Sequence, residues 1–255
     1  MPDILRQVRR AVLASLLLLA GSFLADRASA EDSYLLALTW QPGFCADQVH
    51  AAFNECKIAP KDQPRLVLHG LWPDWDVNGD GKRNADDAFC IPGDDNRNSM
   101  MALDQGNWLK LPPMKLSQAS SNDLAAAMPG TTAGLDRHEW WKHGTCSKLP
   151  PDEFFAIAVA LMREVERGSL ARLIVDHAGA AVARKKVLEA FELDFGPKSA
   201  RALALDCRDG ALQEIRIRLK RATVTQGLTA DTLAFPAKPP RGDCADQIQI
   251  PGWQN

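Results

Sequence analysis

The sequence has no long apolar run after residue 30. A helix that crosses a bilayer needs about 20 consecutive apolar residues, so a multi-span membrane protein is excluded. The chain also has no internal repeat and no linker rich in glycine, serine or proline. These absences favour one domain over an array of small modules.

An excess of positive charge is also missing. The formal net charge of the chain is −2, which excludes a basic coat for tight, sequence-independent binding to DNA. We therefore expect no stable complex with DNA. An enzyme that holds RNA briefly in a small cleft needs no basic surface, so RNA is not excluded as a substrate.

Two short patterns are absent as well. No two cysteines have Cys-x-x-Cys spacing, which argues against a zinc ribbon or a redox motif. No Asn-x-Ser/Thr acceptor site for N-glycosylation occurs. The even number of cysteines predicts three disulfides in an exported chain and leaves 15 pairings open. The cysteines are Cys45, Cys56, Cys90, Cys146, Cys207 and Cys244.

The first thirty residues have the parts of an export signal. Their start is basic, residues 11–20 are apolar, and residues 28–30 form a small-residue cleavage site. We expect a signal peptide over 1–30 and a single mature domain over 31–255, exported to the periplasm or outside the cell, free of the membrane and monomeric. The signal holds four arginines and two aspartates, so its removal changes the net charge from −2 to −4.

Short apolar runs bounded by glycine or proline predict strands, and Asp209-Gly210 between two of them predicts a hairpin. Apolar residues at helical spacing predict helices, one of which starts at Pro151. The irregular mixture favours a single α+β domain with a mostly antiparallel central sheet packed with several helices. We expect strands over 34–40, 65–69, 202–205, 215–219 and 247–250, helices over 136–143, 151–165, 169–176 and 182–191, and a loop over 76–95.

Two segments hold most of the residues suited to chemistry: residues 66–74, Leu-Val-Leu-His-Gly-Leu-Trp-Pro-Asp, and residues 138–146, His-Glu-Trp-Trp-Lys-His-Gly-Thr-Cys. At about 100° per residue, the polar side chains of a helix over the second segment share one side, with Trp140 and Trp141 beneath it. A histidine from each segment, acting as base and acid, can cleave a phosphodiester without a metal. The candidate catalytic residues are His69, His138, Glu139, Lys142 and His143.

The second segment also invites comparison with the zinc-protease pattern His-Glu-x-x-His. The spacing from His138 to His143 is one residue too long, and two residues five apart on a helix diverge by about 140°. Lys142 adds a positive charge beside the position of the metal. We therefore interpret the segment as a metal-free site.

The two segments resemble the signature motifs of the ribonuclease T2 family, which are His-Gly-Leu-Trp-Pro and His-Glu-Trp-x-Lys-His-Gly-Thr-Cys. Residues 34–45 are also similar to the first strand of that family, so the resemblance runs from about Tyr34 to Cys146. It implies a ribonuclease T2-like fold and a secreted or periplasmic acid endoribonuclease. The implied substrate is single-stranded RNA, cut with little base preference and without a cofactor for catalysis.

The resemblance also implies roles for individual residues. His143 takes the proton of the ribose 2′-OH and His69 protonates the leaving 5′-oxygen, although the reverse order stays open. Glu139 and Lys142 stabilise the transition state, and His138 holds the phosphate. A 2′,3′-cyclic phosphate forms first, and water opens it to a 3′-phosphate.

Further positions follow from the same resemblance. Trp72 and Asp74 match positions near the base pocket of the family, and Trp75 is a candidate for an aromatic residue that the family often has nearby. By analogy, the disulfides pair Cys45 with Cys56, Cys90 with Cys146, and Cys207 with Cys244.

A second pattern directly follows the first segment. Residues 76–87 have oxygen-bearing side chains at loop positions 1, 3, 5, 9 and 12 and glycine at position 6, which resembles the calcium loop of EF-hands and dockerins. An ordinary polar turn is the alternative. A chain that served this loop alone would be a non-catalytic, secreted, calcium-dependent binding protein. The predicted ligands of a structural Ca²⁺ are Asp76, Asn78, Asp80, Asp87 and the backbone carbonyl of Lys82.

Overall fold

The computed structural model describes residues 32–47, 49–60, 63–76, 87–236 and 242–253, all within the unit Glu31–Asn255. The predicted signal peptide and most of the predicted calcium loop lie outside the described residues. None of the described helices combines the length and the apolar character that crossing a membrane requires.

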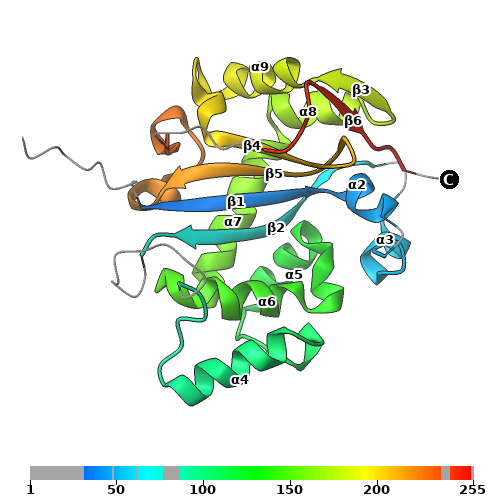
Figure 1. Cartoon of the computed structure of the whole chain (residues 1–255). Coiled ribbons are helices and arrows are strands. Elements are labelled where there is room, and N and C mark those ends of the chain that lie inside the picture. The colour runs from blue at the N-terminus through cyan, green and yellow to red at the C-terminus, as the bar shows by residue number, and fades with distance from the viewer. Residues whose placement is uncertain (1–31, 48, 61–62, 77–86, 237–241, 254–255) are drawn as a thin grey trace, which may run out of the picture. The chain divides into compact units, whose positions relative to one another are not determined.

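The described strands form one six-stranded sheet with the order β2-β1-β5-β6-β3, and β4 pairs with β5 (Figure 1). All pairs are antiparallel except β5 with β6, so the mostly antiparallel sheet is confirmed. The predicted hairpin is also present, because Asp209 and Gly210 both have positive φ, as a tight two-residue turn requires. The strands are β1 (Ser33–Trp40), β2 (Leu66–Asp74), β3 (Ala180–Ala183), β4 (Leu203–Arg208), β5 (Ala211–Lys220) and β6 (Gln247–Ile250).

The central strands β1, β2 and β5 divide their side chains between two faces. Leu36 and Leu38 of β1 lie opposite Ile217 and Ile215 of β5, and all four are fully buried in the core. Residues one position away on β5 are polar and point to the other face, because side chains alternate along a strand. That second face carries the site described below.

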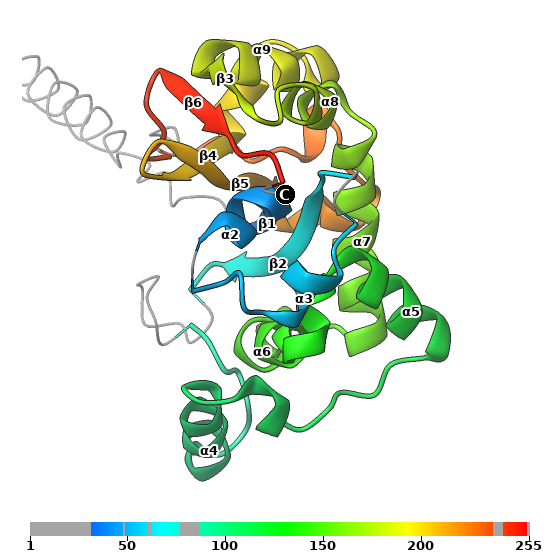
Figure 2. The same cartoon turned by 90° about the vertical axis from the view of Figure 1, so that its right-hand side faces the viewer.

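Helix α7 (Pro151–Glu166) packs against β1 and β2 (Figure 2). As predicted, Pro151 occupies the first turn and the acidic residues Asp152 and Glu153 follow it, where they favour the positive end of the helix. Its apolar stripe, which includes Phe154, Phe155 and Leu161, is buried in the core. This helix therefore covers the apolar side of the strands that carry the first motif.

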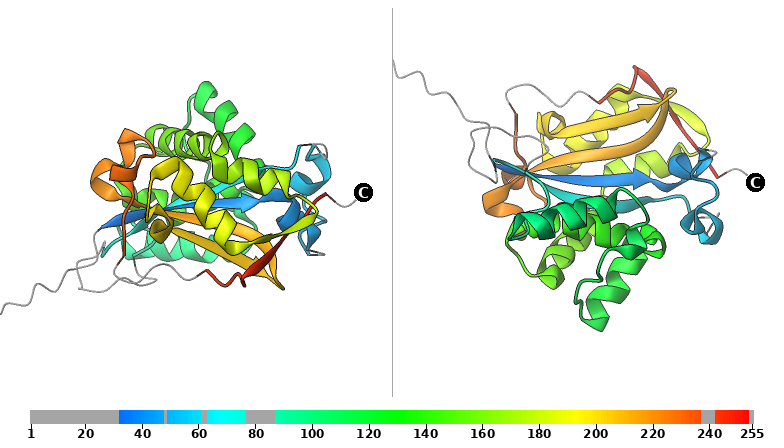
Figure 3. Two further views of the ribbon diagram at one scale, coloured as in Figure 1. Left: turned by 90° about the horizontal axis from the view of Figure 1, so that it is seen from above. Right: turned by 60° about the horizontal axis from the view of Figure 1, so that its bottom comes forward.

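The other helices lie around the sheet, with α4 and α6 on the β2 side of it (Figures 1 and 3). They are α2 (Gln41–Ala46), α3 (Asn54–Ile58), α4 (Asp94–Asp104), α5 (Gln118–Ala127), α6 (Leu135–Lys142), α8 (Ser169–Asp176) and α9 (Arg184–Phe195). Short 3-10 turns connect them, namely η1 (Trp108–Lys110), η2 (Pro129–Ala133), η3 (Gly144–Ser147), η4 (Ser199–Ala202), η5 (Arg221–Gln226) and η6 (Ala230–Thr232).

Several boundaries differ from the prediction, among them the start of β5, which lies at Ala211 and not at 215. β2 does not stop at Gly70 but runs on to Asp74, because β1 continues to pair with it. The helix expected over 182–191 begins at Arg184, since Val182 pairs with Ile248 of β6 in a short strand. The loop expected over 76–95 ends two residues early, because α4 begins at Asp94.

The three predicted disulfides, Cys45–Cys56, Cys90–Cys146 and Cys207–Cys244, are present. The second one joins the segment before α4 to η3, the turn that directly follows α6. It therefore ties the end of the second motif to a part of the chain more than fifty residues earlier.

Candidate active site

His69 occupies a bulge in β2. Ala37 of β1 lies opposite Gly70 and Leu38 lies opposite Leu68, so His69 has no partner in the ladder. A bulge turns the side chain of the extra residue away from the regular alternation. The tertiary pairing of β1 with β2 therefore aims the first histidine.

Gly70 is needed because the two motifs approach each other closely at this position. A Cβ atom at this position would lie 1.9 Å from Oε2 of Glu139 and 2.4 Å from Nε1 of Trp72. The missing side chain thus lets the carboxylate of the second motif approach the backbone of the first.

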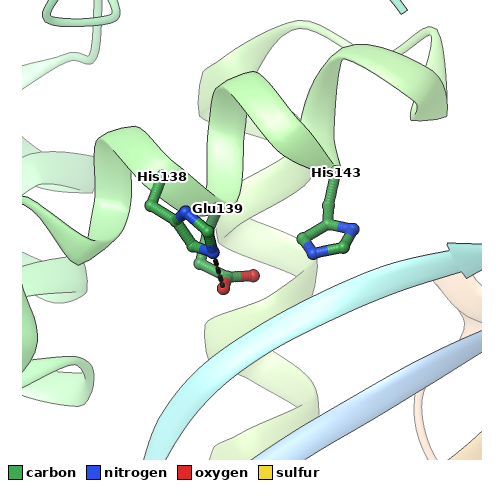
Figure 4. Close-up of side chains that lie close together, drawn as sticks. All are labelled: His138, Glu139 and His143. Atoms are coloured by element: carbon green, nitrogen blue, oxygen red, sulfur yellow. Dashed lines mark ion pairs between the residues drawn. The ribbon is translucent and has the colours of Figure 1, made fainter. Parts of the chain in front are cut away.

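The second motif covers the end of α6. His138 and Glu139 are buried on the helix, while His143 follows its last residue with a φ of −115°. Figure 4 shows all three side chains on the side of the helix that faces β2. Trp140 packs beneath, against Phe154 and Phe155, as predicted.

Glu139 joins the two motifs. Its side chain is fully buried, and Oε2 accepts a hydrogen bond of 2.7 Å from Nε1–H of Trp72. Oε1 lies 3.7 Å from Nε2 of His69 and 3.8 Å from Nε2 of His138, and it has no hydrogen-bond partner among the described residues. Burial raises the pKa of Glu139 to about 7, although His69 and the Trp72 hydrogen bond act in the opposite direction.

The surroundings of His69 favour its protonated form. Nδ1 lies 2.5 Å from Oε2 of Glu214 on β5. Burial lowers the pKa of His69, but the hydrogen bond to Glu214 and the negative charges of Glu139 and Glu214 outweigh it, so the pKa is above the ordinary value.

The surroundings of His143 favour its neutral form. Burial, and then the positive charge of Lys142, hold the pKa of His143 well below the ordinary value. Among the described residues, no carboxylate forms a hydrogen bond or an ion pair with this ring. The site therefore holds one histidine suited to carry a proton and one suited to accept it.

His138 has a third environment. Its Nδ1 lies 2.5 Å from Oδ1 of Asp104, and its ring stacks on Trp108 with centroids 4.4 Å apart. Burial lowers its pKa, and Asp104 only partly opposes this. The carboxylate fixes the ring, with Nε2 turned toward Glu139.

His138, Glu139 and His143 could hold a metal ion, because each offers a ligand atom within 4.8 Å of the other two. The expected divergence of the two histidines is wrong, since their ring centroids lie 6.3 Å apart. The charge of Lys142, which lowers the pKa of His69, His138 and His143, opposes a divalent cation there and favours an anion.

Trp72 lies among the catalytic candidates. Its ring is edge-on to His69 at 5.1 Å and tilted by 32° against His143 at 5.5 Å. With its indole N–H bonded to Glu139, the side chain is part of the contact between the motifs. A role in stacking on a base stays a prediction for this residue.

Asp74 and Trp75 lie at the far end of β2. Asp74 forms an ion pair with Arg218 and accepts a hydrogen bond of 3.3 Å from Ser33. Trp75 is 3% exposed, packs edge-on to Tyr34 and lies under the Arg221 guanidinium. The idea that Trp75 serves as a base-side aromatic is wrong, because the core covers its ring.

A pocket of about 440 Å³ opens beside His69. His50 lies in its wall, stacked on Phe44 with centroids 4.1 Å apart, and Phe53 stands next to both rings. Gln41, which is buried, and Glu55 line the same pocket, and Oε1 of Gln41 and Oε2 of Glu55 have no hydrogen-bond partner among the described residues. The pocket has room for a nucleobase, and both aromatic rings and polar side chains line it.

Sequence reasoning missed Glu214, Asp104, Trp108 and His50. Each lies outside the two motifs, and each reads in sequence as a solvated polar residue or a core aromatic. A weak signal existed at Glu214 alone, because it interrupts a strand between Leu212 and Ile215, both of which are buried.

The predicted calcium ligands Asn78, Asp80 and Lys82 lie outside the described residues. Asp76 and Asp87, which flank them, are described. The Ca²⁺ site therefore stays a prediction.

Comparisons with known proteins show the family of the chain. The model of the ribonuclease T2 family matches residues 31–232. Ribonuclease I of Escherichia coli (strain K12) is 28% identical over 232 residues, which are 86% of this chain and 85% of that protein.

Two solved structures are similar in fold. The self-incompatibility associated SF11-RNase of Nicotiana alata has a TM-score of 0.54 and 20% identity, over 87% of this chain and 99% of that one. Ribonuclease MC1 from bitter gourd seeds has a TM-score of 0.52 and 17% identity, over 85% and 98%. The family match spans both motifs and most of the sheet, and the chain belongs to the ribonuclease T2 family as an endoribonuclease of the T2 type.

Proposed function

We propose that this enzyme cleaves single-stranded RNA with little base preference, without a metal, through a 2′,3′-cyclic phosphate. The observation that carries the proposal is that two histidines near Glu139 have neighbours of opposite charge. His69 is bonded to a carboxylate, whereas His143 lies beside the positive charge of Lys142.

In the first step, neutral His143 accepts the proton of the ribose 2′-OH. The 2′-oxygen attacks the phosphorus, the bond from phosphorus to the 5′-oxygen breaks, and His69 gives its proton to that oxygen. Each proton transfer of this kind contributes roughly 10²–10⁴-fold in rate. The products are a 2′,3′-cyclic phosphate and a free 5′-hydroxyl.

In the second step the two histidines exchange roles. His69, now neutral, takes a proton from water, and the water oxygen attacks the phosphorus. The bond from phosphorus to the 2′-oxygen breaks, and His143 returns its proton to that oxygen. A 3′-phosphate results, and both residues regain their starting forms.

The groups between the histidines stabilise the charge that develops on the phosphate. Lys142 supplies a positive charge, and His138, fixed by Asp104, directs Nε2 toward the same space. Protonated Glu139 donates a hydrogen bond to a phosphoryl oxygen. Because its pKa is about 7, this form is present at acidic pH and is lost as the pH rises through 7.

The nucleophile of this reaction belongs to the substrate. DNA lacks the 2′-OH and does not react by this route. The pocket beside His69 takes the nucleotide whose 5′-oxygen leaves. A variant of ribonuclease MC1 has been solved with 5′-UMP, and a nucleotide of that size suits such a pocket.

We also propose that the enzyme acts as a monomer in the periplasm or outside the cell. Three disulfides in one chain are typical of an oxidising compartment. Fractionation of cells that express the full-length chain tests this location, and cytoplasmic enzyme with reduced cysteines would contradict it.

The deciding experiment incubates the mature protein with RNA and DNA of one sequence in EDTA. We expect RNA cleavage with transient cyclic phosphate ends, and intact DNA. Loss of RNA cleavage that Zn²⁺ or Mg²⁺ restores would instead assign His138, Glu139 and His143 to a metal. Binding of Ca²⁺ without any cleavage would favour the calcium-dependent binding protein.

A further inference from the structure

We propose that Glu214 is a positioning residue for the general acid: it holds Nδ1–H of His69 so that Nε2 presents its proton to the leaving 5′-oxygen. The inference rests on the proposed role of His69. Glu214 belongs to neither signature motif and stands 145 positions from the histidine in the chain.

The sheet brings the two residues together. Glu214 lies opposite Thr39 of β1, and Thr39 lies opposite Val67 of β2. Two residues beyond Val67, the bulge releases His69 from its ladder position, and Nδ1 comes to 2.5 Å from Oε2 of Glu214. The contact therefore depends on the register of three strands and on the bulge.

Glu214 is itself held in place. Its Oε1 lies 3.7 Å from Nε of Arg216, and Arg216 hydrogen-bonds to Asp206 of β4. The carboxylate thus has one oxygen toward His69 and the other toward a cation, and its side chain is only 17% exposed. Such a group has little freedom to leave the imidazole.

This contact decides which ring nitrogen faces the substrate. A carboxylate accepts hydrogen bonds and donates none, so the contact holds the proton of His69 on Nδ1. Nε2 is left pointing toward Oε1 of Glu139, where the phosphate is proposed to bind. A mobile ring would present either nitrogen and would spend time in unproductive orientations.

His138 has a similar contact with a carboxylate and so provides a comparison for His69. Asp104 makes a contact of the same length with His138, which is proposed to hold the phosphate and not to transfer a proton. Asp104 is therefore the matched control. The groups that face His69 and also act on its charge are Glu139 and Lys142 of α6, Glu55 of α3, and His138 and His143.

The test measures kcat of the variant Glu214→Gln on two substrates that differ in their leaving group. One substrate is a dinucleotide, whose 5′-oxygen must gain a proton as it leaves. The other is a uridine 3′-(4-nitrophenyl phosphate), whose leaving group departs as an anion. We expect kcat to fall by roughly 10- to 100-fold on the dinucleotide, less than the roughly 10²–10⁴-fold that a whole proton transfer contributes because the acid itself remains. On the nitrophenyl ester we expect kcat to fall by no more than about twofold.

Two comparisons complete the design. Asp104→Asn should slow both substrates by the same factor, because the phosphate is common to them. Glu214→Asp keeps the carboxylate and should recover part of the dinucleotide activity. The alkaline limb of the dinucleotide pH profile should move to lower pH in Glu214→Gln, and imidazole NMR should show a lower pKa for His69.

Equal losses on both substrates would overturn the proposal, and so would an unchanged imidazole spectrum of His69. His69→Ala separates this failure from that of the proposed function. If His69→Ala slowed the nitrophenyl ester as strongly as the dinucleotide, His69 would not be the acid. If His69→Ala left kcat on the nitrophenyl ester unchanged while Glu214→Gln lowered it, only the role of Glu214 would be wrong.

Discussion

The two halves of the site are held by different means. β2 presents His69 from within the sheet, between ladder pairs with β1 on both sides of the bulge. α6 presents His143 just past its end, where the last carbonyls lack partners within the helix. There, Phe89 N–H donates to the carbonyl of Lys142, and the disulfide Cys90–Cys146 closes the turn.

The two halves also differ in charge. The histidine of the sheet lies near two carboxylates, Glu214 of β5 and Glu139 of α6, whereas the helix end places a lysine next to its own histidine. The surroundings thus raise the pKa of one histidine and lower that of the other. This difference is the reason for proposing His69 as the acid and His143 as the base.

Removing either histidine should have the largest effect. His69→Ala and His143→Ala should each lower kcat on RNA by roughly 10²–10⁴-fold, because each removes one proton transfer. Steady-state kinetics on a dinucleotide checks this. His177 lies outside the site, with Nδ1 2.8 Å from the carbonyl of Leu173. If His177→Ala were as damaging as His143→Ala, the assignment would be wrong.

Removing the disulfide Cys90–Cys146 should affect the part of the site that α6 and η3 hold. Replacing Cys90 and Cys146 by serine should cost about 2–4 kcal/mol in the free energy of unfolding and should also lower kcat, because η3 and the end of α6 lose their anchor. Urea unfolding and kinetics measure the two effects.

The pair Cys207 and Cys244 is the control for this change. Its removal should cost similar stability and leave kcat near the wild-type value, since it lies at β4 and away from the motifs. A loss of kcat in the control as large as in the other pair would mean that general destabilisation explains both.

Replacing Glu139 should show how much the burial of its carboxylate between the two motifs reduces the free energy of unfolding. Its pKa rises from 4.5 in the unfolded chain to about 7 in the fold. Folding is therefore not penalised below pH 4.5, and a penalty of roughly 3 kcal/mol develops as the pH rises to 7 and above. Glu139→Gln should remove this penalty at pH 8 and change little at pH 4.

Unfolding curves at the two pH values test this, with Glu166→Gln as a more exposed comparison. The stabilisation should come with a loss of activity, since Glu139 lies at the proposed phosphate site. An equal change in stability at pH 4 and pH 8 would contradict the raised pKa.

Calcium should have the smallest effect. The segment over 76–87 runs from the end of β2 toward Cys90, so an ion there would act on the connection between the halves. Binding to the folded chain alone should raise the melting temperature and substrate affinity, with kcat little changed. Calorimetric titration of the chelator-stripped protein measures the binding, and Asp80→Ala should abolish it. No binding at millimolar Ca²⁺ would leave an ordinary polar turn.

Much of the fold followed from local pattern. The strands over β1 and β5, the hairpin at Asp209-Gly210 and the stripe of α7 depend on periodicity and turn chemistry that a few neighbouring residues contain. The short helices α2 to α5 were not predicted, because their sequences have no clear apolar stripe at helical spacing. α4, for example, buries none of its residues.

The sequence by itself determined the chemical groups of the site, their order in two motifs and, through the family resemblance, the three disulfides. Only the tertiary structure decided how those groups are charged and aimed. The carboxylates on His69 and His138 come from 145 and 34 positions away, and the bulge at His69 exists only in the pairing of β1 with β2. Protonation depends on burial and on neighbouring charges, and both are properties of positions in space that no local pattern of residues contains.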